Sequence, residues 1–281
     1  MLPQTNFKNQ VNAVGGLLFL VVGGYFTWDL TRSREIPACS GRLGVATQMS
    51  FQRPDGTVLS PAEFQARVGI SERGIIEKTS IQRVVGEKPL ILNIALGGPS
   101  GEDKGAGFSW SLPGVSKGRS ACLSYNVFVP ADFAYGEGGN LPGLFALANG
   151  STGEGVPSGV VAGITWSDQG ALNLVVRYSG LAMPVDAYRP FWWPANGALP
   201  RGRWVRIEQE AVLNTPLQAD GIARIWVDGK LALEKPDLMW RAHPGVQWAG
   251  TLADISYAQP IQSNDKKPTT LQLTPPQMSW Q

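Results

Sequence analysis

Apolar and polar residues alternate along much of the chain in short runs, and such alternation is typical of β-strands that are buried on one face. In residues 122–129, Leu123, Tyr125 and Val127 share one face of the expected strand, and the residues between them share the other. Comparable β-rich runs occupy residues 75–85, 90–96, 160–166, 172–178, 205–213, 223–227 and 252–257. Many short strands at this spacing predict an all-β sandwich or barrel.

Turn and helix signals separate these runs. Residues 167–170 lie between two of the expected strands and indicate a hairpin, and Asp228-Gly229 is a strong signal for a second hairpin. Ser60 can cap a helix, Pro61 suits its first position, and Glu63 can complete the capping box. The sequence therefore predicts one short helix after Ser60 in a chain that otherwise consists of strands and turns.

The beginning of the chain has a different pattern. Residues 11–28 carry no charge, and a stretch of about 18 such residues is near the lower limit for a helix that spans a bilayer. Its glycines would weaken a helix in water but permit close helix packing in a membrane, and they are Gly15, Gly16, Gly23 and Gly24. We expect a retained single-pass anchor. The alternative is a cleaved signal peptide, which the charged segment after the apolar run disfavours.

These patterns divide the chain into four parts. Residues 1–28 are the expected membrane anchor, and residues 29–70 are a stalk that contains the short helix. Residues 71–262 hold the strands of the expected sandwich. Residues 263–281, which include Pro275-Pro276, are expected to form an irregular tail.

Charge and cysteine usage exclude several classes of function. Charged residues make up 16% of the 281 residues, the net charge is +2, and no run of Lys and Arg occurs, so nothing favours nucleic-acid binding. A single histidine makes a His-based metal site improbable, and we expect neither a metal nor a cofactor. Cys39 and Cys122 are far apart in the sequence and are either one disulfide in an oxidising compartment or two free thiols.

Residues 188–194 form the most unusual local run, because four of the seven residues are aromatic. Exposed aromatic side chains often mark binding surfaces. This run is suited to stacking on sugars, to contact with another protein or to contact with a membrane, and its alternative is an ordinary loop over the edge of the sandwich. The candidate binding residues are Tyr188, Phe191, Trp192 and Trp193.

Several longer patterns occur in a fixed order between residues 122 and 241. They are LSYNVFVPADF at 123–133, GGNLPGL at 138–144, ITW at 164–166, GRW at 202–204 and WVDG at 226–229. Together they resemble polysaccharide lyase family 14, the alginate and glucuronan lyases, over somewhat less than half of the chain. The resemblance implies a concanavalin-type jelly-roll β-sandwich. The GGNLPGL string is fairly specific, whereas the pattern of GRW, a strand and WVDG is shared by many jelly rolls.

The catalytic positions of that family are not matched here. The family has a lysine where this chain has Asn140, and a Ser-x-Arg where it has Val161 and Gly163. Elimination needs a cation for the uronate carboxylate and a nearby acid or base, so these replacements argue against catalysis. Arg177 and Tyr178 could stand for the family's strand tyrosines, which leaves Asn140, Arg177 and Tyr178 as candidate residues of a rearranged lyase site.

The hypothesis favoured by the sequence is a non-catalytic accessory subunit of a membrane complex, whose partners are the lipid bilayer and integral membrane subunits. The alternatives are a tethered glycan-binding module, with an acidic polysaccharide as partner, and an active polyuronate lyase. Basic residues on both sides of the apolar run leave its orientation open. The cysteines and the resemblance place the body on the periplasmic side of the inner membrane.

Overall fold

The computed structural model describes residues 36–68, 74–83, 90–97, 105–148, 159–179, 190–259 and 269–281. The expected anchor, with Gly15, Gly16, Gly23 and Gly24, lies outside the described residues, and so does Tyr188. Among the helices of the described part, none has the length and apolar character needed to cross a membrane. Residues 37–281 form one compact unit, and the description below concerns this unit.

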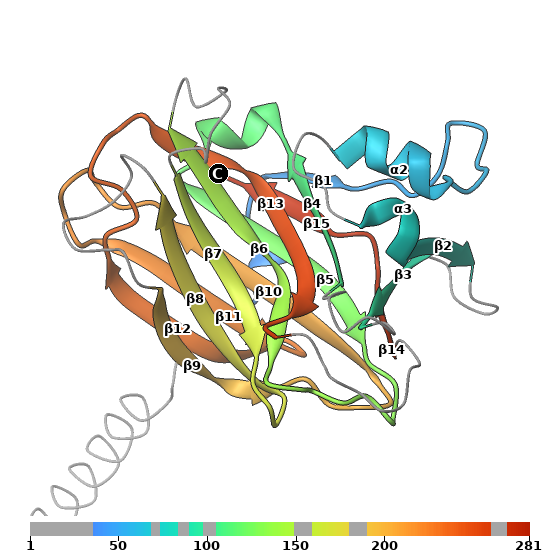
Figure 1. Ribbon diagram of the computed structural model, residues 1–281. Coiled ribbons are helices and arrows are strands. Elements are labelled where there is room, and N and C mark those ends of the chain that lie inside the picture. Colours follow the sequence, from blue (N-terminus) through green and yellow to red (C-terminus); the bar gives the residue numbers. More distant parts are fainter. Residues whose placement is uncertain are drawn as a thin grey trace, which may run out of the picture. The chain divides into compact units, whose positions relative to one another are not determined.

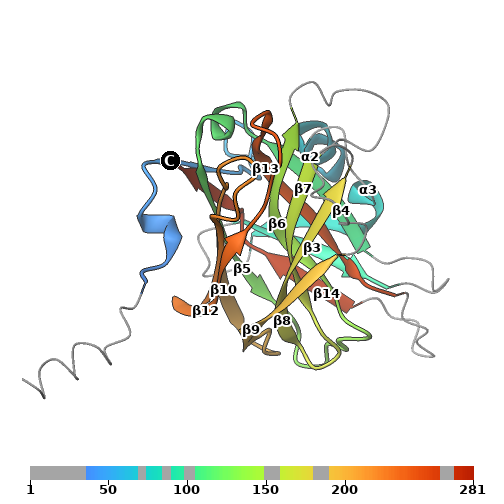
Figure 2. The same ribbon diagram turned by 90° about the vertical axis from the view of Figure 1, so that its left-hand side faces the viewer.

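The unit is built from two antiparallel β-sheets, which form the two layers visible in Figures 1 and 2. The six-stranded sheet has the order β4-β13-β6-β7-β8-β9. Its strands are β4 (Gly105–Ser111), β13 (Val246–Tyr257), β6 (Gly139–Ala148), β7 (Gly159–Trp166), β8 (Ala171–Ser179) and β9 (Phe191–Ala198). This sheet carries the candidate site.

The nine-stranded sheet has the order β12-β11-β10-β5-β14-β3-β2, and β15 joins it by pairing with β5 and β1. Its strands are β12 (Lys230–Leu238), β11 (Gly221–Val227), β10 (Trp204–Val212), β5 (Ser120–Phe128), β14 (Thr269–Leu273), β3 (Leu90–Leu96), β2 (Thr79–Arg83), β15 (Gln277–Trp280) and β1 (Val45–Gln48). Both predicted hairpins are present, since β7 pairs with β8 and β11 pairs with β12.

Alternate residues of both sheets point into one hydrophobic core. In β7 the core residues are Val160, Ala162, Ile164 and Trp166. Because successive side chains of a strand point to opposite faces, the residues between them, including Gly163 and Thr165, lie on the outer face of the six-stranded sheet. The all-β sandwich predicted from the alternation is therefore confirmed.

The predicted helix is also present, as α2 (Pro61–Val68). Its capping box is complete: the amide of Ser60 donates to the Glu63 carboxylate at 2.8 Å, and the amide of Glu63 donates to Ser60 Oγ at 3.3 Å. The run predicted as a strand over residues 75–85 begins instead as a helical turn, α3 (Ile75–Lys78). Gly74 with φ +65° starts this turn, and β2 follows it.

The prediction of an irregular tail is wrong for residues 269–281, because these residues contain β14 and β15. Leu271, Leu273 and Met278 are buried in the core. Pro275-Pro276 belongs to the short connection between β14 and β15. The alternation on each side of the prolines is too short to stand out in the sequence. The partners of these strands, β3 and β5, come from far earlier in the chain, and their pairing is what makes the tail part of the sheet.

The expected stalk is corrected as well, since residues 37–48 are fixed to the nine-stranded sheet. The 3₁₀ turn η1 (Cys39–Gly41) is joined to β5 by a Cys39–Cys122 disulfide with a Cα–Cα distance of 5.9 Å, so the disulfide alternative is the correct one. Arg42 donates to the buried carboxylate of Glu210 at 2.8 Å, and the amide of Ser40 donates to Glu208 at 3.0 Å. The disulfide and the two hydrogen bonds to buried carboxylates therefore hold residues 39–42 on the nine-stranded sheet.

Candidate functional site

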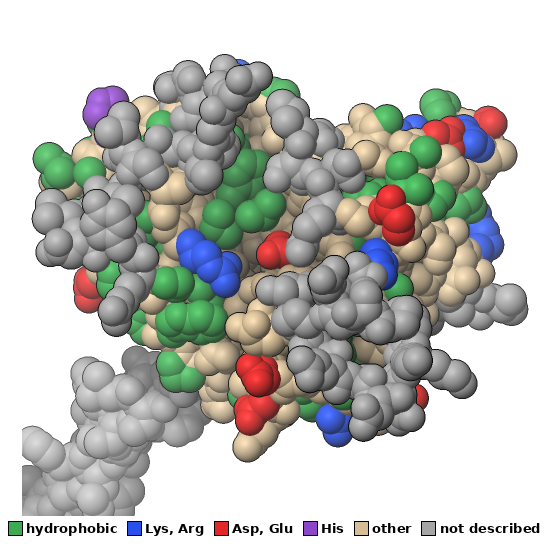
Figure 3. All heavy atoms as spheres, in the orientation of Figure 1, with side chains coloured by type: hydrophobic (Ala, Val, Ile, Leu, Met, Phe, Trp, Pro, Cys, Tyr) green, Lys and Arg blue, Asp and Glu red, His purple; other side chains and the backbone are tan. Residues whose placement is uncertain are grey.

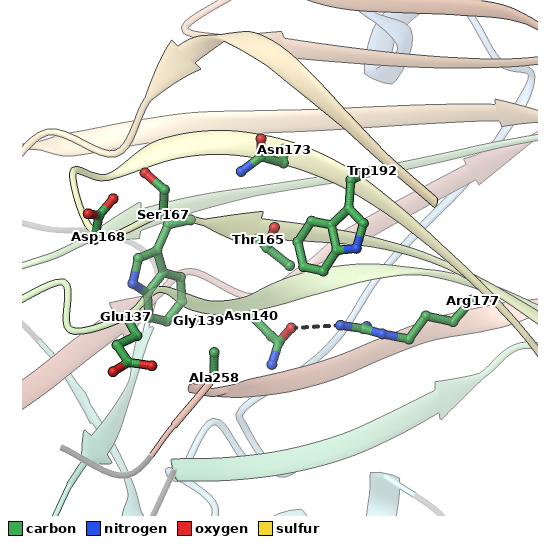
Figure 4. Close-up of a pocket in the computed structure, with 11 residues that line it drawn as sticks. Glu137, Gly139, Asn140, Thr165, Ser167, Asp168, Asn173, Arg177, Trp192 and Ala258 are labelled. Carbon is green, nitrogen blue, oxygen red and sulfur yellow. Dashed lines mark hydrogen bonds between the residues drawn. The ribbon is translucent and has the colours of Figure 1, made fainter. Parts of the chain in front are cut away.

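A cavity of about 550 Å³ opens on the six-stranded sheet. Figure 3 shows that basic, acidic and apolar side chains lie close together around the middle of the visible face. The side chains that line the cavity come mainly from β6, β7, β8 and β9, and Figure 4 shows them. They are Glu137, Gly139, Asn140, Thr165, Trp166, Ser167, Asp168, Asn173, Arg177, Trp192 and Ala258.

The strand register places a row of polar residues across this face. Ser256 of β13 pairs with Asn140 of β6, Asn140 pairs with Thr165 of β7, and Thr165 pairs with Asn173 of β8. Directly opposite side chains on neighbouring strands are about 5 Å apart. Four residues that are distant in the sequence therefore form one polar row on the outer face.

Hydrogen bonds join this row to two charged groups. The Nδ2 group of Asn140 donates to Ser256 Oγ at 3.3 Å, and Ser256 Oγ donates to Asp254 Oδ1 at 3.1 Å. At the other end, Arg177 Nη2 donates to Asn140 Oδ1 at 3.3 Å. Asn140, where the resemblance expects a lysine, thus connects a cation to a polar row and supplies no charge of its own.

Arg177, one of the candidate residues of the rearranged lyase site, supplies a cation in the wall of the cavity, whereas Asn140 and Gly163 carry no charge. Its guanidinium lies over Gly163: a Cβ at this glycine would be 3.6 Å from Arg177 Nη1. Burial lowers the pKa of Arg177, and the charge of Asp254 acts in the opposite direction, but arginine stays protonated in proteins. The comparison of motifs predicts that Gly163 removes a charge from this site, whereas in the fold Gly163 leaves room for the charged side chain of Arg177 from the next strand.

Thr165 has an unusual environment for a polar side chain. It is 3% exposed, and its Oγ1 has no hydrogen-bond partner within the described part of the chain. A buried polar group without a partner costs about 1–3 kcal/mol. Because Thr165 lines the cavity, a ligand there can supply the missing hydrogen bond.

The candidate aromatic residues of β9 divide between the two faces of the sheet. Trp192 is 53% exposed and lines the cavity, where Figure 4 shows its ring at the same end as Arg177. Phe191 and Trp193 point the other way: their rings stack 6.0 Å apart, and Phe191 packs edge-on against Tyr178. Within the described part of this run, only Trp192 belongs to the cavity.

Tyr178, a candidate residue of the rearranged lyase site, does not line the cavity. It follows Arg177 in β8 and so points to the opposite face, where it packs against the core. Its hydroxyl donates to the carbonyl of Met239 at 2.7 Å, and burial raises its pKa to about 12. Of the three residues proposed for that site, the structure brings together Asn140 and Arg177 and leaves Tyr178 out.

Few of the described residues that line the cavity near Arg177 could transfer protons or bind metal, and the Asp254 carboxylate that acts on Arg177 is not among them. The described lining residues include no lysine, tyrosine or histidine, and the carboxyl groups of Glu137 and Asp168 lie at the end of the cavity away from Arg177 (Figure 4). Among the described residues, one group has the spacing of a metal site, formed by Cys39, Cys122 and Glu208. Its two sulfur atoms share the disulfide, so they are not available as thiolate ligands.

Comparison with solved structures shows the fold. A PL-14 alginate lyase from Aplysia kurodai matches with a TM-score of 0.60 and 20% identity over 75% of this chain and 90% of that chain. An alginate lyase from Chlorella virus gives 0.58 and 19% over 75% and 91%, respectively. An endo-β-1,4-glucuronan lyase from Trichoderma reesei gives 0.52 and 11% over 89% and 96%. No family model and no curated protein matches the chain.

The chain therefore has the jelly-roll fold of the alginate and glucuronan lyases, as the resemblance implied. At this identity the likeness concerns the fold alone. Sequence reasoning identified Asn140, Arg177 and Trp192 but missed Thr165, Asn173 and the acidic residues of the cavity. The alternation in residues 160–166 and 172–178 was a signal for the first two, since it assigns them to the face of Arg177.

Proposed function

We propose that this protein binds a polysaccharide chain on the outer face of its six-stranded sheet and does not cleave it. The observation that carries the proposal is the half-exposed ring of Trp192 beside a row of polar side chains in one cavity. Sugars have apolar C–H faces that stack on aromatic rings, and hydroxyl groups that bond with amides and hydroxyls. Ligand sites commonly combine such an apolar surface with a few placed polar groups.

The absence of cleavage is inferred from the groups that surround Arg177. Elimination would require a base within hydrogen-bond reach of the acidic C–H and a group that protonates the leaving oxygen. Tyr178 faces the core, and Asn140 does not titrate. Within the described residues, the two acids that line the cavity, Glu137 and Asp168, lie at its other end, and Asp254, whose charge acts on Arg177, accepts a hydrogen bond from Ser256 and does not line the cavity. A site of this composition supports binding better than proton transfer.

Replacing Trp192 by alanine tests this proposal. We expect the affinity of the full chain for β-linked oligosaccharides to fall by roughly 10- to 100-fold, because the loss of an aromatic contact in a binding site costs about 1–3 kcal/mol. Phe191→Ala is the matched control, since Phe191 is adjacent, is 44% exposed and faces away from the cavity. Isothermal titration of both variants decides the matter. Equal losses of affinity in the two variants would exclude the cavity as the binding surface.

A second function is favoured by the sequence of the first 28 residues. We propose that residues 11–28 anchor the protein in a membrane and that Gly16 and Gly23, about two helical turns apart, contact partner helices. The double variant Gly16→Leu with Gly23→Leu should stay in the membrane fraction and lose its partners in pull-downs after mild detergent extraction. Unchanged co-purification of the same partners would show that this segment serves at most as a tether.

A further inference from the structure

The Cys39–Cys122 disulfide lies beside a buried carboxylate. The two sulfur atoms and a carboxylate oxygen of Glu208 all lie within 4.8 Å of one another, and the three residues are at most 2% exposed. Cys122 of β5 pairs with Glu210 of β10, so Glu208, two residues earlier on the same face of β10, is its diagonal neighbour. The fold thus brings two sulfur atoms and one oxygen, from three separate parts of the chain, to one point on the nine-stranded sheet.

These three atoms are of the types that zinc binds in proteins. Zinc is bound by thiolate sulfur at about 2.3 Å and by carboxylate oxygen at about 2.1 Å. An ion bound by two thiolates holds their sulfur atoms roughly 4 Å apart. Cys39 and Cys122, whose Cα atoms are 5.9 Å apart, can reach this spacing by rotation of their side chains. In the oxidised chain the sulfur atoms are bonded to each other, so they become ligands only after reduction.

The carboxylate of Glu208 is oriented and still has room for a metal ion. Its Oε1 accepts from Arg206 Nε at 2.7 Å, and its Oε2 accepts from the amide of Ser40 at 3.0 Å. A carboxylate has about four lone-pair sites, so these bonds leave part of its capacity unused. Burial acts to raise the pKa of Glu208, but hydrogen bonds from Arg206 and Ser40 lower it. The group is therefore ionised, as a metal ligand must be.

We propose that reduction of the disulfide converts Cys39, Cys122 and Glu208 into a site for Zn²⁺, and that the bound metal then holds η1 on β5 in place of the bond. Reduction by a dithiol breaks the S–S bond, adds two electrons and two protons to the cysteines, and leaves the dithiol as a disulfide. The cation displaces both thiol protons when it binds. Two thiolates, one carboxylate and Zn²⁺ carry one net negative charge, which the guanidinium of Arg206 beside Glu208 balances.

The site gives the connection between η1 and β5 a second form. Disulfides persist in oxidising compartments and are reduced in others, whereas a zinc–thiolate site forms only from reduced cysteines. Residues 39–42 are then fixed to the sheet in either environment. The inference is independent of the proposed glycan binding, because the cavity lies on the six-stranded sheet and this site lies on the nine-stranded sheet.

The test uses the full chain, in which Cys39 and Cys122 are the only two cysteines. A water-soluble phosphine reduces the disulfide: it becomes the phosphine oxide with an oxygen atom from water, and the two protons of water end on the sulfur atoms. Cadmium chloride, a spectroscopic substitute for zinc, is then titrated into the protein. We expect the ultraviolet absorbance of cadmium–thiolate bonds to saturate at one ion per chain and to disappear on addition of excess Zn²⁺. The oxidised chain should give no such absorbance.

Glu208→Gln separates a three-ligand site from a pair of thiolates. The affinity of the reduced chain for cadmium should fall by at least about tenfold, since even groups outside the ligand shell contribute about 10- to 100-fold to metal affinity. Glu210→Gln is the matched control, because Glu210 is a comparably buried carboxylate on the same face of β10 and lies outside the group. Its loss of affinity should be smaller.

A stability measurement on the wild-type chain needs no variant. Zinc should raise the urea midpoint of the reduced chain, because it binds the folded site, and should leave the midpoint of the oxidised chain unchanged. A disulfide that resists the phosphine in the folded chain would overturn the proposal, since the ligands would not form. Reduction without cadmium–thiolate absorbance, or a midpoint that zinc does not move, would overturn it as well. Equal losses of affinity in Glu208→Gln and Glu210→Gln would remove Glu208 from the site.

Discussion

Substituting alanine for Gly143 is expected to destabilise the protein by several kcal/mol. A Cβ at this position would lie 2.2 Å from the carbonyl oxygen of Ala162 and 2.7 Å from the Cα of Gly163. Both are backbone atoms of the neighbouring strand β7, so β6 and β7 would have to separate. Overpacking of this kind costs about 1–3 kcal/mol, and more where the backbone must move. Urea unfolding monitored by tryptophan fluorescence gives the change in the free energy of unfolding.

Gly163→Ala is the matched control for this variant. The two glycines lie on adjacent strands, but a Cβ at Gly163 would meet its nearest atoms at 3.6 and 3.7 Å, which is ordinary contact. Its unfolding free energy should therefore stay within about 0.5 kcal/mol of the wild type. A similar loss in both variants would contradict the strand spacing described above. Gly143 is the second-to-last residue of the GGNLPGL string. A loss of stability in Gly143→Ala would show that the fold requires glycine at this position, because β7 leaves no room for a Cβ.

Loss of the Cys39–Cys122 disulfide should destabilise the sandwich by about 4 to 5 kcal/mol in the chain-entropy model. The estimate follows from the sequence separation of 83 residues that the bond closes. Both cysteines are buried, and η1 lies on β5 and β10 through this bond and through Ser40 and Arg42. The double variant Cys39→Ala with Cys122→Ala is compared with the wild type in urea unfolding.

The control for packing is the wild-type chain after reduction with a dithiol under the same conditions. Reduction removes the bond and keeps both side chains, so it should reproduce most of the loss seen in the double variant. An unfolding free energy that does not change on reduction would show that the contacts of Arg42 and Ser40 hold the segment without the bond.

The charged contacts of this segment depend on pH. Burial acts to raise the pKa of Glu208, but hydrogen bonds from Arg206 and Ser40 outweigh it and lower the pKa.

That lowered pKa fixes the sign of the pH dependence. A carboxyl group whose pKa is lower in the folded than in the unfolded state stabilises the fold above its unfolded value, here 4.5. The contribution is lost as the pH falls through the folded-state pKa. The segment around η1 is thus held most firmly at neutral pH in an oxidising solution.

Much of the fold was predictable because burial on one face leaves a period of two in the sequence. The runs that became β5, β7, β8, β10 and β11 are long enough to show this period, and Asp228-Gly229 marks its hairpin directly. β14 and β15 were missed because each spans only four or five residues beside two prolines. The turn at Ile75–Lys78 was missed because isoleucines favour strands, whereas Gly74 in the left-handed region begins a helical turn there.

The candidate site was predictable only in part, because its residues meet through strand pairing. Asn140 and Arg177 are 37 positions apart in the sequence, and nothing local indicates that they form a hydrogen bond. The opposite orientations of Arg177 and Tyr178 could have been inferred, since neighbouring residues of a strand point to opposite faces. The position of the guanidinium over Gly163 required the packing of β7 against β8.

The central claim is that the cavity holds a polysaccharide without cleaving it. The most direct measurement is a titration of the full-length chain with alginate and glucuronan oligosaccharides, in which bound ligand and the ultraviolet absorbance of unsaturated product are followed in the same samples. The account predicts saturable binding of at least one oligosaccharide, reduced in Trp192→Ala, with absorbance that stays at the level of a protein-free control. A steady rise in absorbance that depends on the protein and disappears in Arg177→Met, or no binding of either oligosaccharide, would contradict it.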